Sequence, residues 1–367
     1  MGGKIPVTVI SGFLGSGKTT LLNLLLLDAA RGRGNAQAPA RTVVLINELG
    51  DVGLDHERVM HLDDRIVLLE SGCICCAVRG DLVNAMRQLF LDALYKKIPP
   101  FSALVVETTG IADPAPIMYT LQYERFLADR YAYAGCVTVV DGQHGLQQLL
   151  RHPEAAQQAV LADALVISKA DLAAEADIAV LRRELERLNP AGEQYLMQSL
   201  PGLDTLLRTV ADCQGVLRRP AAGGVWSGPA SGRGRSPHTG VGVLTMRWPR
   251  PWARAAFTRA LSDLLASTGT GLLRMKGRVR FCGEPHVYSL HAVHQQLYPI
   301  EPMVPPVSAS PGRGRRTDGA VNAGIEDEGC VLVLIHRGLE EDALLHQIQT
   351  LLPGGTRALS SDGNFIQ

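Results

Sequence analysis

Residues 12–20 read Gly12-Phe-Leu-Gly-Ser-Gly-Lys-Thr-Thr20. The stretch contains the pattern G-x-x-x-x-G-K-T without a gap, and it lies between an apolar run ending at Ile10 and a leucine-rich segment. A glycine-rich turn between a strand and a helix lets backbone N–H groups surround phosphate oxygens, and the helix N-terminus favours negative charge. The stretch therefore predicts a P-loop within an α/β nucleotide-binding domain.

The residue types in this loop define separate roles in binding a nucleoside triphosphate. Lys18 is expected to reach the β- and γ-phosphates, and the hydroxyl of Thr19 is expected to bind Mg²⁺. The pattern alone does not select the base. We expect the nucleotide to contact Gly12, Gly15, Ser16, Gly17, Lys18, Thr19 and Thr20.

A second acidic motif follows at residues 103–110, which read Ala103-Leu-Val-Val-Glu-Thr-Thr-Gly110. P-loop enzymes need a carboxylate at the end of such a strand to hold Mg²⁺ through water, and a mobile glycine whose N–H detects the γ-phosphate. Glu107 stands where aspartate is commoner. We expect Glu107 to act with Lys18 and Thr19 in hydrolysis, and Gly110 to contact the nucleotide.

The base is indicated by residues 164–171, an apolar run that ends in Ser168-Lys-Ala-Asp171. This ending resembles the guanine-selecting pattern N-K-x-D. Asp171 can accept hydrogen bonds from the guanine N1–H and 2-amino group, which adenine does not supply, and the stem of Lys169 would lie over the purine. Ser168 replaces asparagine, so it keeps a hydroxyl and loses an amide. The motif predicts GTP and GDP as ligands.

Three of the seven cysteines are crowded into Gly72-Cys73-Ile-Cys75-Cys76. In a reducing compartment such crowding indicates metal or redox chemistry more than disulfides. Thiolates favour Zn²⁺ or Cu⁺, and three of them leave a fourth position for a carboxylate, histidine or water. Glu48 lies in the acidic, glycine-rich segment 47–55 and is a candidate for Mg²⁺ or for this site. Buried apolar cysteines and a thiol redox pair are the alternatives.

The first half of the chain alternates apolar, β-branched runs with helical patterns, which predicts a mostly parallel sheet. We expect strands at residues 5–10, 42–47, 65–70, 103–107, 135–141 and 164–168. Helices are expected at residues 17–30, 81–96, 114–123, 155–161 and 174–188.

A Gly/Pro/Arg-rich stretch divides the chain into two predicted domains. The first spans residues 1–213, the linker spans 214–240, and a smaller α+β domain spans 241–360. In the second domain we expect strands at residues 241–247, 272–282, 286–294 and 330–336, and helices at 252–266 and 340–351. A Pro/Gly-rich insert without predicted structure covers residues 299–327.

The bulk composition excludes several classes of protein. Of the 367 residues 46% are hydrophobic and 20% are charged, as in globular proteins. Lys+Arg and Asp+Glu number 36 each, which offers no global attraction to nucleic acid or anionic membranes. No apolar run approaches the roughly 18 residues of a membrane span, and the N-terminus lacks the secretory pattern. We expect a cytoplasmic protein without nucleic-acid or membrane partners; a homo-oligomer is compatible with the sequence.

Together these motifs resemble a CobW-type GTPase, in the same broad group as the nickel-handling HypB and UreG proteins. The resemblance rests on GFLGSGKTT at 12–20, NELGDVGLD at 47–55, GCICC at 72–76, ETTGIADP at 107–114 and SKAD at 168–171. The second half is similar to the CobW C-terminal domain through LRMKG at 273–277 and VLIHRG at 333–338.

The resemblance implies a Ras-like P-loop domain with an appended small domain, slow GTP hydrolysis, and delivery of Zn²⁺ or Co²⁺ to a client metalloprotein. By motif position, Cys73, Cys75 and Cys76 would be the metal ligands, with Glu48 as a further candidate. The chain departs from the family at Ser168 and in lacking a histidine-rich tract. A metal-sensing GTPase switch without metal transfer is the main alternative. A phosphotransferase, which Ser168 to Asp171 argue against, and a structural zinc protein are the others.

Overall fold

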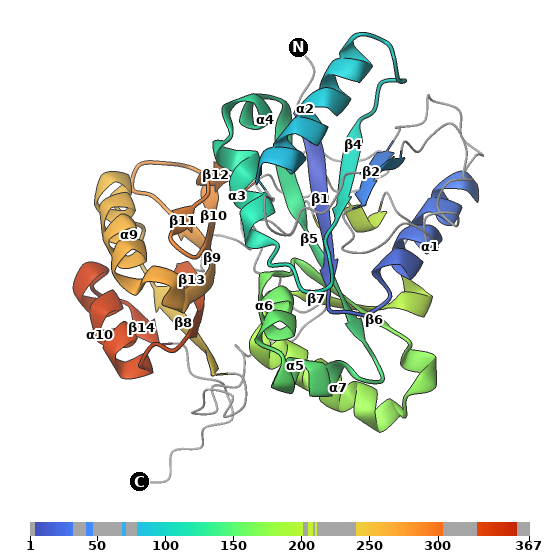
Figure 1. Cartoon of the computed structure of the whole chain (residues 1–367). Helices are drawn as coiled ribbons and strands as arrows, with labels where there is room; N and C mark the ends of the chain where they lie inside the picture. The colour runs from blue at the N-terminus through green and yellow to red at the C-terminus, as the bar shows by residue number, and fades with distance from the viewer. Residues whose placement is uncertain are drawn as a thin grey trace, which may run out of the picture. The chain divides into compact units, whose positions relative to one another are not determined.

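The computed structural model describes residues 4–31, 42–46, 68–70, 79–200, 205–207, 210, 240–303 and 329–357 (Figure 1). These residues fall into two compact units, one built by residues up to 210 and one built from residue 240 onward. No helix among them is long and apolar enough to cross a membrane.

The first unit is built on a sheet whose described strands are all parallel. Seven strands lie in the order β3-β2-β4-β1-β5-β6-β7. Their side chains are largely buried in the central strands, as expected where helices cover both faces. The strands are β1 (Ile5–Gly12), β2 (Thr42–Ile46), β3 (Leu68–Glu70), β4 (Ala103–Glu107), β5 (Tyr131–Asp141), β6 (Ala164–Ser168) and β7 (Glu193–Leu196).

Two hydrophobic cores form because alternate residues of a strand point to opposite faces. Ile10 packs with the leucines of the first helix on one face, whereas Val7 and Val9 pack with the second, third and fourth helices on the other. The helices of this unit are α1 (Lys18–Arg31), α2 (Arg79–Leu94), α3 (Ala115–Tyr123), α4 (Arg125–Arg130), α5 (Gly145–Arg151), α6 (Pro153–Leu161) and α7 (Glu175–Leu188).

The predicted parallel sheet is confirmed, and the bounds of β4 and β6 match the expectation. The sequence did not reveal α4, α5 or β7, each of which has seven residues or fewer. Strand β5 also begins at Tyr131, four residues before the expected start at residue 135. Tyr131 is buried there, and its hydroxyl donates to the carbonyl of Met86 at 2.9 Å.

In the second unit the described residues form an antiparallel sheet and two α-helices. The strand order is β11-β10-β9-β13-β8-β14, and β12 pairs with β10. The strands are β8 (Val241–Trp248), β9 (Leu272–Arg280), β10 (Val287–Val293), β11 (Gln296–Leu297), β12 (Glu301–Pro302), β13 (Cys330–Arg337) and β14 (Thr356–Arg357), and the helices are α9 (Arg254–Thr268) and α10 (Glu341–Leu351).

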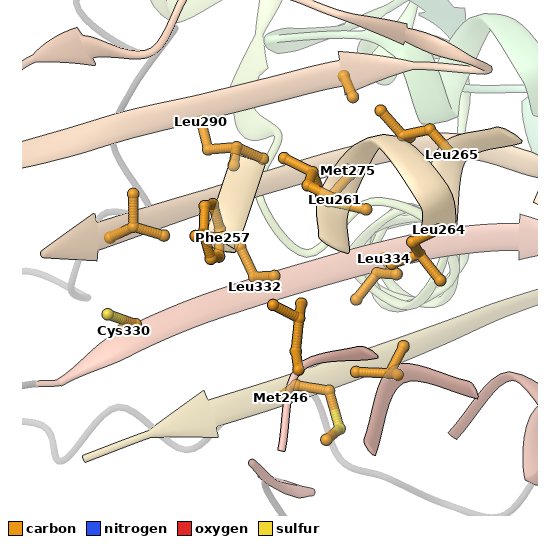
Figure 2. Close-up of a cluster of buried hydrophobic side chains, with 14 of the residues drawn as sticks. Met246, Phe257, Leu261, Leu264, Leu265, Met275, Leu290, Cys330, Leu332 and Leu334 are labelled. Carbon is orange, nitrogen blue, oxygen red and sulfur yellow. The ribbon is translucent and has the colours of Figure 1, made fainter. Parts of the chain in front are cut away.

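The expected smaller domain is thus present, with one correction to the predicted insert. Residues 301–302, which fall inside the stretch 299–327 predicted to lack structure, form strand β12. The core of this unit lies between the sheet and its helices. Figure 2 shows Phe257, Leu261 and Leu264 of α9 directed toward the strands, where they join one buried cluster.

Position 277 of strand β9 requires glycine because the neighbouring strand leaves no room for a side chain. The strand is central, paired with β10 on one side and with β13 on the other. A Cβ atom at position 277 would lie 2.6 Å from the carbonyl oxygen of Val331 on β13, and it would also clash with the side chain of Leu332. Because that carbonyl belongs to the sheet backbone, it cannot yield as a flexible side chain would.

We therefore expect Gly277→Ala to lower the free energy of unfolding of the second unit by about 1–3 kcal/mol, the usual range for overpacking. Urea unfolding followed by tryptophan fluorescence measures this, because Trp248 and Trp252 both lie in that unit. Arg259→Ala, at an exposed position of α9, is the control and should change stability by less than about 0.5 kcal/mol. Equal stability of the two variants would contradict the packing argument.

Candidate nucleotide site

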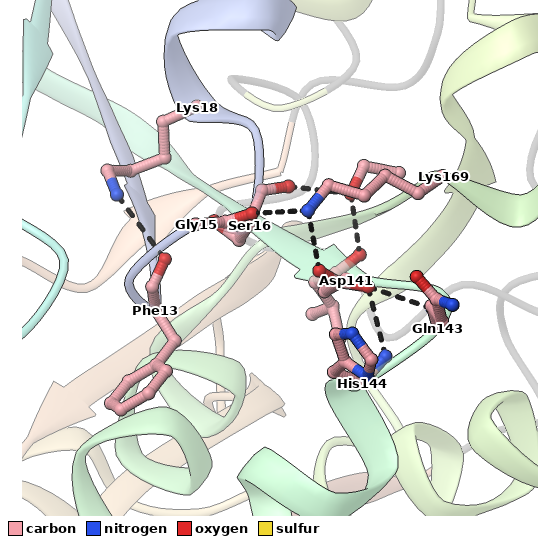
Figure 3. Close-up of polar contacts among 10 residues, drawn as sticks. Phe13, Gly15, Ser16, Lys18, Asp141, Gln143, His144 and Lys169 are labelled. Atoms are coloured by element: carbon pink, nitrogen blue, oxygen red, sulfur yellow. Dashed lines mark hydrogen bonds and ion pairs between the residues drawn. The ribbon is translucent and has the colours of Figure 1, made fainter. Parts of the chain in front are cut away.

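The predicted phosphate loop lies between the end of β1 at Gly12 and the start of α1 at Lys18. Gly12 has φ 145° and Gly17 has φ 94°, backbone conformations that favour glycine. A Cβ atom on Gly12 would also lie 2.7 Å from the hydroxyl of Ser16. The ammonium of Lys18 donates to the carbonyl of Gly12 at 3.1 Å. It also lies 3.4 Å from the carbonyl of Phe13, as Figure 3 shows. The side chain of Lys18 therefore lies along the loop and bonds to the loop's own backbone.

Two predicted Mg²⁺-binding side chains meet beside this loop. The hydroxyl of Thr19 donates to Oε1 of Glu107 at 3.4 Å. Glu107 ends β4 and is only 1% exposed, and it pairs in register with Ile10 of β1. Hydroxyl and carboxylate oxygens are ligands that Mg²⁺ accepts. The two side chains thus fit the ion that the sequence predicts.

The hydroxyl of Ser16 adds a polar group inside the loop. It is buried and has no hydrogen-bond partner among the residues that the structure describes. A buried hydroxyl in that state is costly unless a ligand or ion satisfies it. This observation agrees with the expected contact between Ser16 and a nucleotide.

Gly110 lies against the phosphate loop, as its predicted role requires. A Cβ atom there would come within 2.8 Å of the backbone nitrogen of Leu14, so only glycine permits this approach. Gln158 of α6, which is 1% exposed, donates to the carbonyls of Gly110 at 3.2 Å and Ala112 at 3.0 Å. Sequence reasoning missed Gln158, because a glutamine in an alanine-rich helix carries no local signal of such a contact.

The predicted base-selecting segment meets the phosphate loop directly. The hydroxyl of Ser168 lies 2.6 Å from the carbonyl oxygen of Ser16 and 3.3 Å from that of Val140. A hydroxyl has one proton, so the shorter distance favours donation to Ser16. Ser168 is buried at the end of β6 and thereby ties this segment to the loop, although it lacks the amide of asparagine.

The other two residues of that segment are more accessible. The ammonium of Lys169 donates to the carbonyl of Gly15 at 2.7 Å, and the side chain is 38% exposed. The carboxylate of Asp171 accepts a hydrogen bond from Gln198 at 3.2 Å. Thr20 follows Lys18 and Thr19 in the first turn of α1. The structure therefore brings the predicted phosphate, Mg²⁺ and base residues together.

Asp141 is a member of this network that sequence reasoning did not single out. Its Oδ2 lies 2.7 Å from the ammonium of Lys169, and its Oδ1 accepts from the backbone N–H groups of Gln143 and His144 (Figure 3). Burial raises the pKa of Asp141, but the hydrogen bonds from Lys169, His144 and Gln143 outweigh it and hold the pKa below the ordinary value. The carboxylate is therefore ionised at neutral pH. An aspartate at the end of a predicted strand was the available signal.

The predicted metal ligands Cys73, Cys75, Cys76 and Glu48 all lie outside the described residues. The rest of the segment 47–55 does so as well. Within the described part of the chain, no group of three or more His, Cys, Asp or Glu side chains is arranged to hold a metal ion. The described cysteines are Cys136 and Cys330, which are buried, and Cys282, which is exposed.

Comparison with known proteins decides the family. Residues 6–195 match the model of the CobW/HypB/UreG nucleotide-binding domain, and residues 241–352 match that of the cobalamin synthesis protein CobW C-terminal domain. The chain belongs to the CobW family. Its first unit is accordingly a P-loop GTPase domain, as the sequence predicted.

Relatives within the CobW family cover different shares of the chain. The chain is 31% identical to the zinc chaperone YjiA of Escherichia coli over 294 residues, which are 80% of this chain and 87% of that protein. It is 32% identical over 194 residues to the zinc-regulated GTPase metalloprotein activator 1 of Schizosaccharomyces pombe, which are 50% of this chain and 44% of that protein. The crystal structure of Zn(II)-bound YjiA GTPase aligns over 95% of this chain and 99% of that one, with a TM-score of 0.65 and 24% identity. This CobW-family chain therefore shares the fold of that structure.

The hydrogen bond from Ser168 to Ser16 leads to a prediction for this CobW-family site. We expect Ser168→Ala to weaken GDP binding by up to about tenfold, since losing the donor to a buried carbonyl costs about 1–1.5 kcal/mol. Titration with a fluorescent GDP analogue measures the dissociation constant. Ser199→Ala removes an exposed hydroxyl and should leave that constant unchanged. Unchanged affinity in folded Ser168→Ala would contradict the role assigned to Ser168.

Proposed function

We propose that this chain is a GTP-hydrolysing metallochaperone that binds a transition metal at Cys73, Cys75 and Cys76 and delivers it to a client metalloprotein. Zinc is the favoured metal, because the relatives that the chain matches are named zinc chaperones and zinc-regulated GTPase activators. Cobalt is the alternative. The observation that carries the proposal is the meeting of the loop at 12–20, Glu107 and the segment 168–171 at one edge of a parallel sheet.

In the proposed reaction the chain's own residues bind and orient GTP. Lys18 and the loop N–H groups would hold the phosphates. Thr19 and Glu107 would hold Mg²⁺, which would supply positive charge to neutralise the charge that develops during transfer. Gly110 contacts the γ-phosphate, and Lys169 and Asp171 hold guanine. No arginine finger was evident in the sequence, so unaided hydrolysis is proposed to be slow.

The topology supports a link between the nucleotide and the proposed thiolate site. Ile46, at the end of β2, pairs in register with Glu70 at the end of β3 and with Glu107 at the end of β4. In sequence, Glu48 follows the end of β2 by two residues, and Cys73 follows the end of β3 by three. The ends of β2 and β3, which precede the proposed metal ligands in sequence, therefore lie at the same edge of the sheet as the proposed Mg²⁺ ligand Glu107.

This arrangement suggests how GTP would control the metal. GTP and Mg²⁺ would order segment 47–55 and the segment from Glu107 to Gly110, and hydrolysis would release that order and alter the thiolate geometry. Since binding linkage is reciprocal, the metal would change nucleotide affinity by the same factor. We also place the boundary between the two domains within residues 214–240. The crowded thiols fit a reducing compartment such as the cytoplasm.

The thiolate site is tested by metal titration of the reduced full chain. We expect the triple variant Cys73→Ser/Cys75→Ser/Cys76→Ser to lose the thiolate charge-transfer absorbance of Co²⁺ and to bind Zn²⁺ at least about 100-fold more weakly in competition with a chelator, because serine does not supply a thiolate. Cys282→Ser, which removes an exposed cysteine from the second unit, is the matched control and should bind as the wild type does.

Two outcomes would redirect the proposal. Wild-type affinity in the triple variant would remove the thiolate site and leave a GTPase whose cysteines are structural. Tight binding that an apo-client does not draw off would favour the alternative, a metal-sensing GTPase switch that acts through partner binding.

A further inference from the structure

The buried carboxylate of Asp141 is held rigidly at the end of β5. It is 2% exposed, and both of its oxygens accept hydrogen bonds. Oδ1 accepts from the N–H groups of Gln143 at 2.8 Å and His144 at 3.0 Å, which fixes the turn that follows the strand. Oδ2 is left to face the ammonium of Lys169 at 2.7 Å. One charged group thus joins a backbone turn to a single cation.

Lys169 needs such an anchor because its backbone is unusual. Its φ of 51° places it in the left-handed region, which is unfavourable for a residue with a side chain. The ammonium bridges Asp141 and the carbonyl of Gly15, both at 2.7 Å. With its tip fixed at two points, the four-carbon stem of the lysine has few remaining conformations.

The pair also fixes the segment that carries Asp171. Asp141 pairs in register with Ser168 across β5 and β6, and the N–H of Gly142 donates to the carbonyl of Ser168 at 2.8 Å. Lys169 precedes the short helix at residues 170–172, and its carbonyl accepts from the N–H of Leu172 at 3.1 Å. Displacing Lys169 would therefore move the helix that bears the proposed guanine-selecting carboxylate.

We infer that Asp141 is a positioning residue for guanine recognition, which acts by fixing Lys169 between the phosphate loop and the base-binding segment. Asp141 bonds to Lys169 but belongs neither to the phosphate loop at residues 12–20 nor to the base-binding segment at 168–171. The inference rests on the proposed assignment of Lys169 and Asp171 to the base. Its effect should fall on nucleotide affinity, because Asp141 bonds to Lys169 of the base-binding segment. Of the residues proposed for phosphate transfer, Lys18 bonds to the carbonyl of Gly12 and Thr19 bonds to Glu107.

The test is a double-mutant cycle on the full chain with GDP as the probe. Asp141→Asn keeps an oxygen acceptor for the turn but removes the negative charge. We expect it to raise the dissociation constant of GDP and the KM for GTP by about tenfold, the order expected for a lost charge-assisted contact, with kcat within about twofold. Lys169→Met keeps an apolar stem and removes the ammonium. In that background Asp141→Asn should change GDP affinity by less than about twofold, since the group through which it acts is gone.

Asp163→Asn is the matched control, because Asp163 is also buried and accepts hydrogen bonds from Tyr133 and the N–H of Cys136. It should lower the melting temperature without changing GDP affinity. If Asp141→Asn does not fold, Asp141→Ser enters the same cycle.

Three results would overturn the inference: unchanged GDP affinity in Asp141→Asn, an equal loss in the Lys169→Met background, or wild-type GDP affinity in Lys169→Met itself. The last result would overturn the inference even if none of the Asp141 variants folded. Failure of the wild-type chain to bind GDP would instead contradict the guanine assignment on which the inference rests.

Discussion

The parallel pairing of β1 with β4 and β5 is the constraint on which the whole nucleotide site depends. Because these strands run in one direction, their carboxyl ends lie at the same edge of the sheet, where ligands bind in such folds. Gly12, Glu107 and Asp141 end the three strands, and Ser168 ends the next one. Residues up to 156 positions apart in sequence are thereby brought into one network. Hydrogen bonds between neighbouring strand ends then connect the residues of the site.

The motifs of this network are joined to one another by hydrogen bonds. The carbonyls of Gly15 and Ser16, which belong to the phosphate loop, accept from Lys169 and Ser168. The loop that would hold phosphate and the segment that would hold guanine thus constrain each other. A change at either end is expected to reach the other through two or three hydrogen bonds. The same edge also carries the ends of β2 and β3, from which the proposed metal-binding segments continue.

Much of this site could be predicted from the sequence, because its motifs are contiguous and follow apolar strands. Strands β4 and β6 are each four consecutive apolar residues followed by one polar residue, so their bounds were also predictable. The helices α4 and α5 were not, since fewer than two turns give too few repeats to reveal a period. Asp141 and Gln158 were missed for another reason. Their partners lie 28 and 48 residues away, at Lys169 and Gly110, and only the folded chain brings them together.

The proposed function requires that nucleotide and metal change each other's affinity across this edge of the sheet. The decisive measurement is the affinity of the reduced chain for a slowly hydrolysed GTP analogue with Mg²⁺, with and without saturating Zn²⁺ in a chelator buffer. If the two sites are coupled, Zn²⁺ changes this affinity by about 5- to 150-fold, the usual range of coupling between sites. Equal affinities with and without Zn²⁺ would show that the sites are independent and would contradict the proposed coupling.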